Sequence, residues 1–173
     1  MSGKIVAMIL VVSGLIAGAA MYYFQVYAFY DTVSAEDSEV LLTSVSTGEP
    51  EAIGAESVRA IDADSSPLRY RACFETGLSQ AMLTESYVVY ESAVPNVAPG
   101  WFDCFDAATI GAALEEGTAT AFLGEGNIHY GFDRVVAIGE DGRGFVWHQI
   151  NACGQAFFDG DPLPQGCPAP PEQ

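Results

Sequence analysis

The longest uncharged stretch of the chain, residues 5–30, has the length and composition of a membrane-spanning helix. It runs for 26 residues without a charged side chain. About 20 apolar residues in a helix cross the ~30 Å hydrocarbon core of a bilayer. Aromatic residues, which favour the interface between membrane and water, gather at its far end: Tyr22, Tyr23, Phe24, Tyr27, Phe29 and Tyr30. We therefore expect residues 1–30 to be a transmembrane anchor that delivers everything after them to one side of a membrane.

The charges beside this stretch predict which side that is. Lys4 is the only charged residue before it, and acidic residues follow it at Asp31, Glu36, Asp37 and Glu39. Because cationic flanks stay in the cytoplasm, we expect a single pass through the inner (cytoplasmic) membrane, with a cytoplasmic N-terminus and a periplasmic C-terminal domain. A cleaved signal peptide is the alternative, since residues 17–19 have the small-x-small form of a cleavage site. Apolar aromatic residues continue for about ten positions beyond that site, which favours the uncleaved anchor.

Two glycines in the expected anchor suggest a contact between helices. Gly14 and Gly18 form a G-x-x-x-G pattern, which lets two membrane helices approach closely. Glycine and alanine are common in such segments, so a chance occurrence is the competing interpretation.

The rest of the chain is strongly acidic. After Tyr30 it holds five arginines, no lysine and all 23 acidic residues, which leaves a formal net charge of −18. Nucleic acid is excluded as a partner, because phosphate binding needs a basic surface. Solubility is the simpler explanation of the charge, and docking of a basic periplasmic protein or weak binding of divalent cations is the alternative.

Four cysteines predict two disulfides in an exported domain. None of them forms a C-x-x-C pair, which argues against a thioredoxin-like site and against zinc. Three pairings are possible. We expect Cys73–Cys104, since both lie in apolar aromatic segments, and Cys153–Cys167, which would tie back a tail with five prolines.

The pattern of residues after the anchor predicts an α+β fold: a small, mainly antiparallel sheet with one or two helices, stapled by disulfides. Asp106 is a good N-cap and Gly117 a good stop for a helix over residues 107–116, and residues 78–83 could begin another. Residues 118–123 are ambiguous between helix and strand.

We expect a spacer at 31–39, the domain at 40–167 and a proline-rich tail at 168–173. Expected strands cover 40–45, 58–61, 68–74, 87–90, 128–130, 135–138 and 145–150, with a hairpin turn at 140–144.

Four segments of the sequence resemble a known group of proteins. They are SGKIVAMILVVSGLIAGAAMYY, AIDADSSPLRYRACF, PGWFDCFDA and VVAIGEDGRGFVWHQIN. With these the chain resembles, over nearly its whole length, an uncharacterised family of short single-pass membrane-anchored proteins of Rhodobacter-type alphaproteobacteria. The resemblance implies the topology and no transferable activity.

Few residues are candidates for chemistry. His129 and His148 are the only histidines, and with Asp133 they are the candidate ligands of a metal site of two histidines and one carboxylate. A hydrogen-bonded structural role is the stronger expectation for His148, which lies on an expected strand beside Trp147. Neither a G-x-S-x-G motif nor a P-loop is present. We expect no cofactor, no bound metal and no catalytic residue.

Three classes of function remain after these exclusions. The first and favoured one is an accessory, assembly or structural protein of the cell envelope that binds other proteins, for example within a larger membrane complex. A membrane-tethered module for a small ligand or a metal is the alternative. An enzyme built from scattered residues is the least favoured of the three.

Overall fold

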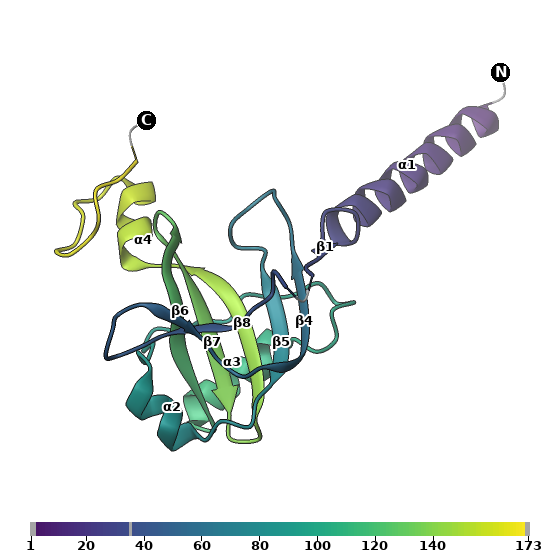
Figure 1. Cartoon of the computed structure of the whole chain (residues 1–173). Helices are drawn as coiled ribbons and strands as arrows, with labels where there is room; N and C mark the ends of the chain where they lie inside the picture. Colours follow the sequence, from purple (N-terminus) through teal and green to yellow (C-terminus); the bar gives the residue numbers. More distant parts are fainter. Residues whose placement is uncertain (1–2, 35, 172–173) are drawn as a thin grey trace.

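The N-terminal segment is a long apolar helix that projects away from the rest of the molecule (Figure 1). A computed structural model describes residues 3–34 and 36–171. Helix α1, Gly3–Val26, has no buried residue. Within the described residues it is the one helix long and apolar enough to cross a membrane. Its length and composition fit a membrane anchor or a signal sequence.

A six-stranded antiparallel sheet forms the domain that follows. The order of its strands is β1-β4-β5-β8-β7-β6. They span Asp31–Thr32 (β1), Glu56–Asp62 (β4), Arg71–Glu75 (β5), Ala119–His129 (β6), Phe132–Gly139 (β7) and Arg143–Ile150 (β8). All five neighbouring pairs are antiparallel. The predicted α+β class is therefore confirmed.

Each face of this sheet is covered by a different layer. On one face, a small hairpin of β2 (Leu41–Thr43) and β3 (Pro50–Ala52) packs with α2 (Gln80–Ser86). The core on this side includes Leu42, Leu83 and Phe122. On the other face, α3 (Ala107–Glu116) and the segment before it enclose a second core around Trp147. Burial on both faces leaves little of the central strands exposed to water.

Helix α3 begins and ends as its sequence predicts. The Asp106 side chain accepts a hydrogen bond from the backbone N–H of Thr109 at 2.9 Å, so it is the N-cap. Gly117 ends the helix with φ of 76°, a left-handed conformation that glycine adopts without steric cost. Both predicted cap residues are thus confirmed.

Several expected elements differ from the structure. Residues 118–123, which were ambiguous, belong to strand β6, whose long pairing with β7 outweighs the helix preference of alanine. Residues 87–90 form isolated bridges only, from Tyr87 to Ser44 and from Val89 to Phe122. Part of the expected spacer is strand β1, which pairs with β4. The segment after β8 contains a helix that was not predicted, α4 (Ala152–Asp159), capped by the Asn151 side chain.

Strand β5 departs from the predicted pattern in a way that matters for the site. The alternation over residues 68–74 predicts a strand with Arg71 facing water. In the structure the strand begins at Arg71, and this side chain is buried with 4% exposure. The expectation is wrong because the segment before α3 covers the face of the sheet that was expected to be solvated.

Both predicted disulfides are confirmed. Cys73 on β5 is bonded to Cys104, which precedes α3. Cys153, in the first turn of α4, is bonded to Cys167 in the tail. The first bond fixes a loop to the centre of the sheet, and the second folds the proline-rich tail back onto α4. Such bonds fit a domain that folds in an oxidising, extracytoplasmic compartment.

Candidate functional site

The side chain of His148 is buried and fully used in internal hydrogen bonds. It lies on β8 with 5% exposure, and its ring stacks on Tyr70 with centroids 4.8 Å apart. Arg134 Nε donates to His148 Nε2 at 3.2 Å, so that nitrogen is the acceptor. The other nitrogen, Nδ1, therefore carries the proton and donates to the carbonyl oxygen of Pro67 at 2.7 Å. This arrangement is that of a structural histidine.

The electrostatic surroundings keep this imidazole neutral. Burial lowers the pKa of His148 to about 4, and the positive charges of Arg134 and Arg71 act in the same direction. The bond to Pro67 opposes the shift only in part. At neutral pH the ring is therefore uncharged, with neither nitrogen free to accept a proton from a substrate.

An open depression of about 430 Å³ lies beside His148. Asp62, Asp64, Ser66 and the exposed His129 line it together with His148. Burial raises the pKa of Asp62, although the positive charge of Arg134 opposes the rise. The structure thus places both histidines, which the sequence proposed as ligands of one metal site, at the same polar depression.

Asp133, the third proposed metal ligand, belongs to a different cluster. It precedes Arg134 on β7, so its side chain points to the opposite face of the sheet from the side chain that contacts His148. Its Oδ1 accepts from the backbone N–H of Asn127 at 2.9 Å and from Asn151 Nδ2 at 2.7 Å. Its Oδ2 accepts from the Tyr90 hydroxyl at 3.1 Å.

These contacts tie the end of β6, the segment around Tyr90 and the N-cap of α4 to one carboxylate on β7. Burial, together with the charge of Asp133, raises the pKa of Tyr90 and keeps its hydroxyl a donor. The structure therefore does not bring His129, Asp133 and His148 together as three ligands. No group of three metal-ligating side chains occurs among residues 3–34 and 36–171.

A buried arginine, which the sequence patterns did not single out, holds the longest loop of the domain. The guanidinium of Arg71 donates to the carbonyl oxygens of Asn96 at 2.9 Å and Val97 at 3.1 Å. It also donates to the carbonyls of Leu68 and Tyr70 at 2.7 and 2.6 Å. Burial lowers the pKa of Arg71 to about 10, so the group remains charged at neutral pH. These four bonds join the loop to β5 and to the turn before it.

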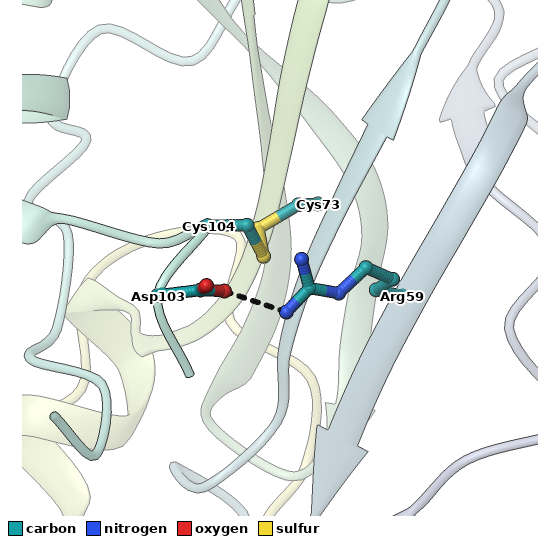
Figure 2. Close-up of polar contacts among 4 residues, drawn as sticks. All are labelled: Arg59, Cys73, Asp103 and Cys104. Carbon is teal, nitrogen blue, oxygen red and sulfur yellow. Dashed lines mark hydrogen bonds and ion pairs between the residues drawn. A yellow bond between two sulfur atoms is a disulfide. The ribbon is translucent and has the colours of Figure 1, made fainter. Parts of the chain in front are cut away.

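The end of this loop is fixed by two neighbouring residues. Figure 2 shows Cys104 bonded to Cys73 on β5 while Asp103 pairs with Arg59 on the adjacent strand β4. The ion pair has an N–O distance of 2.7 Å and both side chains are largely exposed, at 55% and 77%. Exposed pairs of this kind contribute little stability, so the disulfide is the main constraint.

The same loop contacts the end of α1. The indole N–H of Trp101 donates to the carbonyl oxygen of Val26, the last residue of the helix, at 2.7 Å. The Trp101 ring stacks on Tyr27 and meets Tyr30 edge-on, with centroids 6.2 and 6.0 Å away. Together with β1 this contact attaches the apolar helix to the domain at two places.

The two glycines of the G-x-x-x-G pattern lie on the open surface of α1. Neither Gly14 nor Gly18 has another part of the chain within 4 Å of a Cβ built on it. Both therefore remain accessible to a second helix, which stays a prediction.

The fold and these contacts define a disulfide-bonded antiparallel-sheet domain attached to an apolar N-terminal helix. The chain belongs to a family of unknown function (DUF6446), whose model matches residues 40–168. No curated protein and no solved structure matches the chain. The matched residues include both disulfides and leave out α1.

Proposed function

We propose that the chain is a single-pass protein of the inner membrane whose periplasmic domain works by binding other proteins, as an accessory, assembly or structural component. In this proposal α1 is an uncleaved anchor with its N-terminus in the cytoplasm. We also infer that the family is characteristic of Rhodobacter-type alphaproteobacteria. The charge asymmetry around α1 and the resemblance described above support these points.

One observation carries the proposal of a binding role. The buried ionisable side chains of His148, Asp133 and Arg71 direct their polar atoms to groups of the chain itself. The part of the domain that is left to contact other molecules is its outer surface, which is strongly acidic. A fixed acidic surface held at a membrane favours recognition of a basic protein over catalysis.

The test is purification of the full chain from native membranes in mild detergent, after cross-linking and without it. We expect a partner in constant ratio at low salt, with the ratio falling as ionic strength rises, because screening weakens contacts between opposite charges. A chain that elutes alone under both conditions contradicts the proposal.

The depression beside His148 supports a second candidate, a membrane-tethered module for a small polar or cationic ligand. Two carboxylates and an exposed imidazole line its surface. Calorimetric titration of the full chain with zinc and with small cationic metabolites tests it. Binding that is lost in His129→Gln and kept in His148→Gln would favour this candidate, because only His129 has its ring exposed.

A further inference from the structure

One loop of this acidic domain has no charge at all. Residues 92–102, called the 92–102 loop below, read SAVPNVAPGWF. The domain as a whole carries a net charge of −18, so this loop lacks the acidic side chains that are spread over most of the chain after Tyr30. Composition alone leaves open whether these uncharged residues are buried in the core of the domain or exposed on its surface.

Exposure of the side chains shows that much of the loop lies outside the core. Val97 is 80% exposed, Val94 is 65% exposed and Trp101 is 36% exposed. Three apolar side chains so close in sequence and open to solvent are uncommon unless they meet an apolar partner.

The backbone behind these side chains is firmly held. Gln149 accepts from the N–H of Val94 and donates to the carbonyl of Ser92, both at 2.7 Å. Asn96 Nδ2 donates to the carbonyl of His148 at 2.9 Å. Two of the Arg71 bonds reach the carbonyls of Asn96 and Val97, and Cys104 and Asp103 are fixed just beyond the loop (Figure 2), so the loop backbone is held at several points. The exposed side chains are therefore presented on a preorganised support.

The loop lies at the end of α1. Trp101 donates to the carbonyl of Val26 and stacks on Tyr27, so it sits at the level where the apolar helix ends. In an anchored chain that level is the interface between the headgroups and the acyl chains, which tryptophan and tyrosine favour.

We propose that the 92–102 loop is a second contact with the lipid bilayer, in which Val94, Val97 and Trp101 enter the boundary between headgroups and acyl chains. The inference rests on the proposed anchoring by α1. Arg69 lies over the Tyr30 ring at the end of α1, where its guanidinium would meet lipid phosphates. The carboxylates of Asp31 and Asp103 flank the same region and limit the contact to the interface.

Two points of contact would hold the domain in one orientation on the membrane. The turn between β2 and β3 lies on the opposite side of the domain from α1 (Figure 1). In the proposed orientation this side faces away from the membrane and is open to a protein partner.

The experiment compares two exposed valines by fluorescence. The full chain is reconstituted into vesicles of phosphatidylcholine and phosphatidylglycerol, with and without bromine on the upper part of the acyl chains. Val97→Trp places a probe in the loop, and Val94→Trp is a second probe. Val45→Trp is the matched control, because Val45 is also an exposed valine, at 60%, in the distant β2–β3 turn. Trp147 is fully buried, and Trp101 is common to every variant, so the parent protein supplies the background.

We expect the added tryptophan at position 97 to be quenched by brominated lipid at least about twofold more than the one at position 45. Equal quenching in protein that still floats with the vesicles overturns the loop contact and leaves the anchor intact. Protein that does not float overturns the anchor and the loop contact together. A photo-cross-linker at position 97 that joins to a protein in native membranes, and not to lipid, assigns the loop to a protein partner and also overturns the proposal.

Discussion

Phe74 and Gly144 face each other in the pair of strands β5 and β8, and the Phe74 ring fills the space that a side chain at Gly144 would need. Three atoms of the ring would lie well inside van der Waals contact of a Cβ on Gly144. Phe74 is buried with 3% exposure, so the ring has little room to move. The absence of a side chain at position 144 is thus a packing requirement of the core.

Gly144→Ala should therefore destabilise the domain. The forced shift of Phe74 is an overpacking of the core, which typically costs about 1–3 kcal/mol. Urea unfolding of the full chain in micelles, followed by near-ultraviolet circular dichroism, measures the change. Gly111→Ala is the matched control, since Gly111 lies inside α3 with open space around it and alanine there should stabilise by about 0.5–1 kcal/mol. Equal stability of the two variants would contradict the packing described for Phe74.

Arg71→Met should be strongly destabilising, while Arg59→Met should leave the unfolding midpoint almost unchanged. Loss of the Arg71 guanidinium removes bonds to four carbonyl groups, and we expect a cost of at least about 3 kcal/mol. Arg59 makes a pair that is open to solvent. The same unfolding measurement compares the two, and proteolysis in the 92–102 loop should increase only in Arg71→Met. Similar losses in both variants would mean that general charge, not the buried bonds, matters.

Arg71 shows why sequence patterns do not predict every part of the site. Alternation along a strand predicts which residues share a face, but it does not tell whether the second face is covered. That cover comes from residues 92–105, which lie distant in sequence and have no regular secondary structure. The signal for this cover in the sequence is an uncharged run, residues 92–102, shortly before Cys104.

Local signals predicted much of the remaining structure. Asp106 and Gly117 bound α3 because capping depends on a few adjacent residues. The apolar aromatic segments around Cys73 and Cys104 predicted the first disulfide, and the need to tie back a proline-rich tail predicted the second, Cys153–Cys167. Helix α4 was missed because the prolines and glycines that dominate the tail obscure its eight residues, whose N-cap Asn151 also contacts Asp133. The separation of Asp133 from the two histidines depends on strand register, which a single sequence does not specify.

Removal of the tail disulfide should loosen α4 and the tail without unfolding the sheet. In Cys153→Ser/Cys167→Ser a closed loop with a sequence separation of 14 is opened, which costs about 3 kcal/mol in the chain-entropy model. The bond from the Tyr130 hydroxyl to the carbonyl of Pro168 is too weak to replace it. Limited proteolysis with mass spectrometry should show faster cleavage after α4 and an intact sheet.

The comparison is Cys73→Ser/Cys104→Ser, in which the separation is 31 and Cys73 is buried in the core. That variant should lose more stability and be cleaved within the sheet. Identical cleavage patterns in the two variants would contradict the view that the first disulfide stabilises the core and the second only the tail.

A C-terminal alkaline phosphatase fusion to the full chain should be active and should stay with the membrane fraction. The enzyme needs disulfides and is active only outside the cytoplasm, where the proposed topology places the C-terminus. Moving the positive charge, by Lys4→Glu together with Asp31→Lys, should lower the activity of the fusion. A soluble, shortened product would instead show cleavage near residue 19, and an inactive fusion would place the domain in the cytoplasm.

The neutral state of His148 predicts that the domain loses stability as the pH falls from about 6.5 to about 4. The folded-state pKa of about 4 lies below the ordinary value of 6.5, so in this window the unfolded chain binds a proton that the folded chain refuses. Above pH 6.5 the neutral ring costs the folded state nothing. By pH 4 the free energy of unfolding has fallen by on the order of 3 kcal/mol. The raised pKa of Asp62 acts in the opposite direction, because protonation of that carboxyl favours the folded state.

His148→Gln separates the two effects. It should flatten the dependence of the unfolding free energy on pH between 4 and 6.5. His129→Gln should change this dependence much less, because His129 is the smallest of the causes that lower the pKa of His148. Proton NMR of the imidazole resonances in the folded chain gives the pKa of His148 directly. If His148 titrates near 6.5, or if its removal leaves the slope unchanged, burial and the positive charges of Arg134 and Arg71 do not hold the ring neutral in the way that the structure describes.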